Sequence, residues 1–207
     1  MPRTYCQNCR RPSTHCLCSH ISEQCTSFPL VICQHPDESS HPFTTSQIAA
    51  LGASSVQCLK RLDVDQDEIC SLFAGQGTSS IALLYSNHSY EEHESYIINF
   101  DQPESVVSEQ FALFAESVTG LIVLDGTWRN TREIMLRNAW LTKLPTLTLK
   151  GLEKSMYHIR KTDIDSAVST VEAVGQVLKY TERRFDLDTY LMPLKALVEA
   201  QQRYQSR

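Results

Sequence analysis

Residues 121–128 read LIVLDGTW. Four apolar residues in a row, two of them β-branched, predict a strand that is buried on both faces of a sheet. Gly126 allows a sharp turn directly after this strand. Asp125 would therefore lie at the carboxyl end of the strand, where ligands bind in open α/β sheets. In the alternative interpretation, Asp125 only caps the helix that follows, and Trp128 is part of the core.

Further strands and helices alternate along the rest of the chain. Short apolar segments with polar or turn-forming ends predict strands at residues 28–34, 56–62, 81–85, 96–100 and 146–149. Helical periodicity or helix-start signals occur at residues 48–51, 63–68, 108–118, 131–139, 169–178 and 189–204. This alternation predicts an α/β fold with a mostly parallel sheet.

Length and composition favour an ordinary globular protein. The chain has 207 residues, of which 42% are hydrophobic and 21% charged, which suits one large domain with a small appendage. No apolar run reaches the roughly 18 residues of a membrane helix. The first residues, MPRTYCQNCRRP, contain no apolar core of a secretory signal. We therefore expect a cytoplasmic protein without membrane association, whose eight cysteines are thiols or metal ligands.

The net charge of -5 is unevenly distributed. Residues 62–128 contain 12 acidic residues and no Lys or Arg, whereas residues 129–161 contain eight basic residues and two acidic ones. An acidic body with basic segments suits a polyanion bound on one face. Solvated helix surface explains the same pattern, so charge alone does not establish RNA binding.

The N-terminus carries a motif that is typical of zinc sites. Four cysteines lie within thirteen residues, and four thiolates can surround one tetrahedral Zn²⁺: Cys6, Cys9, Cys16 and Cys18. A segment this short cannot bury a core, so we expect a structural zinc ion to fold it. His15, His20 and Cys25 are substitute ligands, and a redox CxxC motif is the alternative. We divide the chain into a zinc-binding segment, residues 1–26, and an α/β domain, residues 27–207.

Taken in order, the motifs resemble the DTW-domain proteins, a family of tRNA-uridine aminocarboxypropyltransferases. The matching residues span about 6 to 180: the four cysteines, His35-Pro36 with Glu38, Leu83-Leu84-Tyr85, Leu124 to Trp128, Leu144-Pro145, and Ser169 to Ala173. The family often has Asn-Thr where Thr44-Thr45 stands here, and Pro where Ser86 stands.

The resemblance implies a reaction and a fold. S-adenosylmethionine (SAM) would donate its 3-amino-3-carboxypropyl group to N3 of a uridine in tRNA, in the variable loop, and methylthioadenosine would be released. The resemblance also implies a SPOUT-like fold with a knotted C-terminal half that binds SAM. An RNA methyltransferase and a non-catalytic zinc-ribbon RNA-binding protein are the alternatives.

Roles for individual residues follow from the motifs. Asp125 is expected to act as general base toward uridine N3 or to hold the SAM ammonium group. The helix start near Ser169 suits the SAM carboxylate, although Glu172 is also explained as a capping residue. The expected catalytic residues are Asp125, Thr127 and Trp128. The expected SAM-binding residues are Leu84, Tyr85, Leu124, Gly126, Ser169, Thr170 and Glu172. The expected tRNA-binding residues are Arg10, Arg11, His35, Arg129, Arg132, Arg160 and Lys161.

Overall fold

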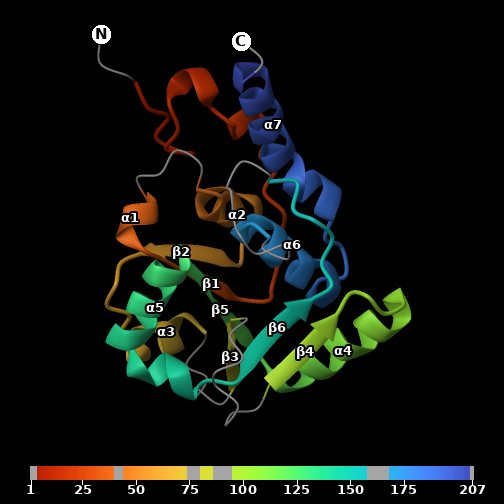
Figure 1. Ribbon diagram of the computed structural model, residues 1–207. Coiled ribbons are helices and arrows are strands. Elements are labelled where there is room, and N and C mark those ends of the chain that lie inside the picture. Colours follow the sequence, from red (N-terminus) through yellow and green to blue (C-terminus); the bar gives the residue numbers. More distant parts are fainter. Residues whose placement is uncertain (1–3, 40–43, 74–79, 86–94, 158–167, 206–207) are drawn as a thin grey trace.

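The sequence folds into an α/β structure around a parallel sheet (Figure 1). The computed structural model describes residues 4–39, 44–73, 80–85, 95–157 and 168–205. All six strands of the described sheet run parallel, in the order β2-β1-β5-β3-β6-β4. They are β1 (Leu30–Gln34), β2 (Val56–Lys60), β3 (Ile81–Leu84), β4 (Ser95–Asn99), β5 (Gly120–Asp125) and β6 (Thr146–Lys150). The predicted fold class and the six predicted strands are confirmed.

Helices cover both faces of the sheet. Alternate residues of β1 and β5 pack into different clusters, with Leu30 and Leu121 on one face and Val31 and Ile122 on the other. The first face is covered by α2 (Ser46–Gly52), α4 (Glu104–Ser117), α6 (Thr170–Thr181) and α7 (Leu187–Gln205). The second face is covered by α3 (Gln66–Leu72), α5 (Trp128–Arg137) and the 3₁₀ helix η4 (Ala139–Lys143). The central strands are therefore buried on both sides, as their apolar sequence requires.

Several elements differ in extent from the prediction. The first strand begins at Leu30 rather than 28, and α5 begins at Trp128 rather than 131. Helix α4 begins at Glu104, directly after Pro103, because proline fits a helix N-terminus. The short helix α1 (Pro36–Ser39) and the 3₁₀ helices η1 (Ser13–His15) and η2 (Cys18–His20) were not predicted, since such short turns carry little periodic signal.

The N-terminal segment packs on the rest of the fold. Leu17 is buried in the same cluster as α2 and α7, and Gln24 forms an isolated parallel bridge with Ala53. Figure 1 shows this segment above α2, beside the C-terminal end of α7. None of the described helices is both long enough and apolar enough to cross a membrane.

Candidate functional site at the carboxyl edge of the sheet

Two neighbouring strands place an amide and a carboxylate side by side. Gln34 and Asp125 are the last residues of β1 and β5, and they are partners in the strand register. Gln34 Nε2 donates to Asp125 Oδ2 at 2.7 Å, and the Thr170 hydroxyl at the start of α6 donates to Oδ1. The carboxylate is thus fixed from two sides and is only 9% exposed. Because a carboxylate offers about four acceptor positions, it can still receive donors from a ligand.

Gln34 has an acceptor that the fold does not use. Its Nε2 must face Asp125, because the opposite orientation would set the amide oxygen against the carboxylate. The same Nε2 also donates to Thr44 Oγ1 at 2.6 Å. Gln34 Oε1 is buried and has no hydrogen-bond partner among the residues that the structure describes. A buried acceptor without a partner costs free energy, so this oxygen suits a ligand that carries N–H or O–H groups.

The turn after β5 is tight, and its geometry decides between the two interpretations of Asp125. A Cβ atom on Gly126 would lie 2.8 Å from the Asn130 Cβ, so glycine is required for this close approach. The cap of α5 is Thr127, whose Oγ1 accepts from the Asn130 amide at 3.3 Å. Trp128 is 49% exposed. The alternative of a capping Asp125 and a core Trp128 is therefore wrong.

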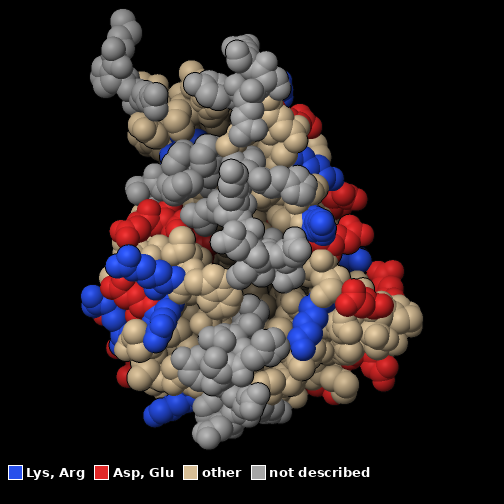
Figure 2. Space-filling view, in the orientation of Figure 1, with Lys and Arg blue, Asp and Glu red and all other residues tan. Residues whose placement is uncertain are grey.

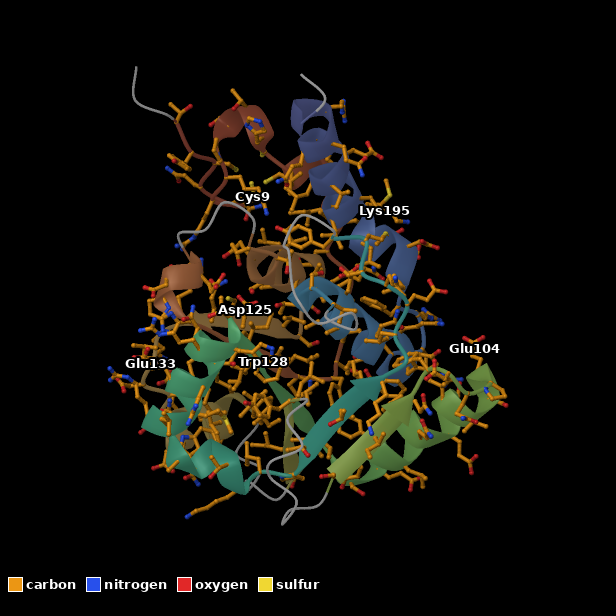
Figure 3. All side chains as sticks on the ribbon, viewed as in Figure 1. Cys9, Glu104, Asp125, Trp128, Glu133 and Lys195 are labelled. Atoms are coloured by element: carbon orange, nitrogen blue, oxygen red, sulfur yellow. The ribbon has the colours of Figure 1, made fainter. Side chains whose placement is uncertain are left out.

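An aromatic pair lies beside the carboxylate. Tyr85, directly after β3, meets the Trp128 ring edge to face with centroids 6.0 Å apart. Since β3 neighbours β5 and Leu84 is the register partner of Val123, this pair stands next to the Asp125 strand end. Figure 3 shows Asp125 and Trp128 close together near the centre of the molecule. The exposed indole offers a flat surface to a ligand at this edge.

Helix α6 begins with a complete capping box. Glu172 is 8% exposed and accepts from the Ser169 amide (2.8 Å), the Ser155 hydroxyl (2.6 Å) and the Met156 amide (2.8 Å). The residue joins the segment before α6 to the helix start, so its oxygens are occupied by the protein. This geometry favours the capping role that the sequence left open, and Thr170 is the residue of this turn that contacts Asp125.

Replacing Glu172 by alanine tests that role. We expect the free energy of unfolding to fall by about 2–4 kcal/mol, because a helix cap is lost and buried donors lose their acceptor. Urea unfolding measures it, with Glu109→Ala on the exposed face of α4 as the matched control, expected within about 0.5 kcal/mol of the unchanged chain. A large loss of SAM affinity at unchanged stability would instead assign Glu172 to the donor.

Two residues expected to contact tRNA lie in the interior. Arg11 is 7% exposed and donates to the Thr44 carbonyl at 2.9 Å. His35 is 4% exposed; its Nδ1 accepts from the Asp37 amide at 3.2 Å, and its Nε2 lies 3.5 Å from Glu133 Oε2. The expected exposure of these two residues is wrong, whereas their contact with tRNA stays a prediction and would have to reach below the surface. Sequence patterns could not reveal their burial, because arginine and histidine are usually found at the surface.

The four N-terminal cysteines converge on one point. Their Sγ atoms all lie within 4.8 Å of one another, with 3.6 Å between Cys6 and Cys18 and 3.7 Å between Cys9 and Cys16. Zn–S bonds of about 2.3 Å in a tetrahedron place sulfur atoms about 3.8 Å apart, so the cluster fits a zinc ion. The amides of Cys9 and Asn8 donate to Cys6 and lower the pKa of its thiol, whereas burial and the neighbouring thiols raise the pKa of Cys18.

The remaining predicted tRNA contacts are spread over the surface. Arg129 and Arg132 are exposed on α5, where Figure 2 shows basic side chains gathered with acidic ones beside them. Arg10 is exposed in the cysteine segment. Arg160 and Lys161 lie outside the described residues. The sequence did not single out Gln34, although a polar residue that ends an apolar strand was a usable signal.

A comparison of the sequence with models of known protein families identifies the family of this chain. Residues 3–202 match the model of the DTW domain. The chain belongs to the DTW domain family. The match covers the cysteine cluster and the carboxyl edge of the sheet together, so both are parts of one family unit. The resemblance read from the ordered motifs is confirmed.

Curated relatives of this DTW chain carry a common name, tRNA-uridine aminocarboxypropyltransferase 2. The Macaca fascicularis protein is 26% identical over 212 residues, and the Mus musculus protein is 27% identical over 208 residues. Each alignment covers 96% of this chain and 64% of the relative, so the chain spans less than two thirds of their length. The Drosophila melanogaster protein is 25% identical over 206 residues, covering 96% of this chain and 75% of its own. No solved structure matches the chain significantly.

Proposed function

We propose that this DTW chain is a SAM-dependent tRNA-uridine aminocarboxypropyltransferase. The observation that carries the proposal is the Asp125 carboxylate, held by Gln34 and Thr170 beside an exposed tryptophan at the carboxyl edge of the sheet. The names of the relatives support the transferred group and the tRNA acceptor. Location in the cytoplasm, a target in the variable loop and a SPOUT-like knot are further parts of the proposal.

The reaction is a displacement at carbon. Uridine N3 attacks the methionine γ-carbon, the bond from that carbon to the sulfonium sulfur breaks, and methylthioadenosine leaves with the electron pair. The sulfonium activates three carbons, so the site selects the product by positioning. The methyl group and the adenosine must be shielded, while the amino-acid arm faces the RNA.

Asp125 has two possible tasks in this reaction. As a general base it takes the N3 proton, and as an anchor it holds the SAM ammonium by a charge-assisted hydrogen bond. The free Gln34 Oε1 beside it supports a donor-bearing group at this position in either case. Thr127 is occupied as the α5 cap, so its part is to set the turn that presents Trp128.

Zinc has a structural task in the proposal. Cys6, Cys9, Cys16 and Cys18 would hold it in a closed four-sulfur shell, which leaves no position for substrate. The ion would fold the N-terminal segment, and no step of the transfer passes through it.

Product analysis tests the proposal. The purified protein is incubated with SAM and unmodified tRNA, and the nucleosides and the by-product are identified by mass spectrometry. We expect aminocarboxypropyluridine and methylthioadenosine. Methylated RNA with adenosylhomocysteine would identify a methyltransferase, and tRNA binding without turnover and indifferent to SAM would identify an RNA-binding protein.

Trp128 provides a further prediction. Trp128→Ala should leave stability nearly unchanged because the side chain is 49% exposed. The loss of one stacked ring, worth about 1–3 kcal/mol, should raise KM for SAM or tRNA by about five- to 150-fold. Steady-state kinetics measure it, with Leu136→Ala on the same helix, 72% exposed, as the matched control. Unchanged KM values for both substrates would remove Trp128 from the site.

A further inference from the structure

A cavity lies along the edge strand β2, outside the site described above. Its volume is about 570 Å³. Its walls come from the cysteine segment, from α2 and α3, and from the carboxyl end of β2: Arg10, Gln47, Ala50, Cys58, Leu59, Lys60, Arg61 and Glu68. The cavity therefore joins elements that are far apart in the sequence.

The cavity has an excess of positive charge. Arg61 is paired with Glu68, which cancels one charge against the only carboxylate of the lining. Arg10 and Lys60 make no ion pair with a carboxylate in the described part of the chain, and Lys60 Nζ donates only to the amide oxygen of Gln47, at 3.1 Å. Burial and the nearby charge of Arg10 lower the pKa of Lys60. An anion between Arg10 and Lys60 would relieve this repulsion.

Arg10 has a backbone conformation that is strained for any residue with a side chain. Arg10 has φ of 56°, and it is the only non-glycine residue with positive φ among the described residues. Its amide donates to the Cys6 carbonyl at 2.9 Å, so it completes the turn of the first cysteine pair. Glycine adopts this conformation without strain, whereas in other residues it lowers the stability of the folded state by about 1–2 kcal/mol. An arginine at such a position points to a function for the guanidinium.

The cavity adjoins the proposed catalytic edge. Lys60 is the register partner of Gln34, which is the register partner of Asp125. Since neighbouring strands are about 4.8 Å apart, the backbone of Lys60 lies about 10 Å from that of Asp125. Cys58, in the lining, lies close enough to Asp125 for the carboxylate to raise the pKa of its thiol, in addition to the larger effect of burial. A strand of RNA with its uridine at Asp125 can therefore reach the cavity with a neighbouring phosphate.

We propose that this cavity binds the phosphate backbone of the RNA substrate, with Arg10 and Lys60 as the phosphate ligands. The inference rests on the proposed function for its choice of RNA over an acidic protein segment. It assigns a task to the cysteine segment, which carries one of the two cations to the catalytic edge. The arginine pair on α5, Arg129 and Arg132, is not needed for it.

Two substitutions test the proposal with little risk to the fold. Arg10→Gly removes the charge and relieves the left-handed backbone, and Lys60→Ala removes the second charge at the end of an edge strand. Affinity for unmodified tRNA is measured at several salt concentrations on the zinc-loaded protein. Each variant should bind tRNA about tenfold more weakly, with SAM affinity unchanged. Each should also lower the slope of log affinity against log salt by about one.

Matched controls separate this result from general effects. Lys143→Ala removes an exposed charge just before the amino end of β6, four strands away from β2 in the sheet, and should change neither quantity. The melting temperature of Arg10→Gly should not fall. Wild-type affinity and salt slope in the double variant would overturn the proposal. Binding of inorganic phosphate that is lost in the double variant, while tRNA affinity and salt slope stay at the wild-type values, would assign the cavity to free phosphate and overturn the assignment to RNA.

The failure of this proposal can be distinguished from the failure of the proposed function. If the chain transfers the group but the double variant keeps full tRNA affinity, only the cavity assignment fails. If the chain transfers nothing and the variants still lose tRNA affinity, the proposed function fails and the assignment of the cavity to RNA holds. Loss of poly-glutamate binding with tRNA binding retained would identify an acidic protein partner and overturn the proposal.

Discussion

Asp125→Asn is expected to lower the rate of aminocarboxypropyl transfer by at least about 100-fold. The substitution removes the negative charge and nearly preserves the shape. The asparagine oxygen can accept from Gln34 Nε2, and its NH₂ group can donate to the Thr170 hydroxyl. The decrease in rate therefore reports the loss of the negative charge and not a disturbed fold. Single-turnover assays with saturating SAM and tRNA give the rate, and calorimetry gives SAM affinity.

The same variant separates the two tasks of Asp125. Retained SAM affinity would favour the general base, and lost SAM affinity would favour the ammonium anchor. Thr170→Val, which removes only one hydrogen bond to the carboxylate, serves as the graded comparison and should reduce transfer by about tenfold. Full transfer activity in Asp125→Asn would remove this residue from the mechanism.

Removal of zinc is expected to weaken tRNA binding by at least the roughly tenfold expected for the loss of Arg10 alone, with a smaller effect on SAM. Zinc supplies about 10–16 kcal/mol to small cysteine-bound segments, so the metal-free segment unfolds and Arg10 leaves the cavity. On the side of the proposed SAM site, the segment contributes the Arg11 bond to the carbonyl of Thr44, whose hydroxyl accepts from Gln34. One hydrogen bond of about 1 kcal/mol predicts less than a tenfold change.

A chelator or Cys9→Ser removes the metal, and both affinities are then compared by titration. Cys25→Ser is the matched control, because this exposed cysteine lies in the same segment outside the cluster. Equal losses of tRNA and SAM binding would indicate global unfolding, which circular dichroism detects. Unchanged tRNA binding in the metal-free protein would contradict the placement of Arg10 in the RNA site.

The main elements of the fold were predictable because burial is periodic. Strands β1 and β5 are buried on both faces and read as unbroken apolar runs, and the capping box before α6 marks a helix start. The strand order was not predictable. β5 lies between β1 and β3 although it follows both in the chain, and no local pattern encodes that pairing.

The site was predictable where one short motif carries it. Asp125, Gly126 and Trp128 follow from a strand, a turn and a helix start in eight residues. Asp125 is contacted by two residues that are distant in the sequence, Gln34 at 91 positions and Thr170 at 45. The tertiary arrangement decides which distant residues meet, and local sequence patterns do not show it. The burial of Arg11 and His35 depends on tertiary packing, which charge and residue type do not encode.

The position of β5 in the sheet has a consequence for how the chain acquires its shape during synthesis. β1 and β2 can pair as soon as they leave the ribosome, but one side of β1 stays open until residues 120–125 arrive. An open strand edge of apolar sequence is prone to pair with other chains. The nascent first half should therefore depend on chaperones or on rapid elongation. Insertion of β5 closes this edge of β1 and also brings Asp125 beside Gln34, so the protection of the edge and the first contact of the carboxylate arise in the same step.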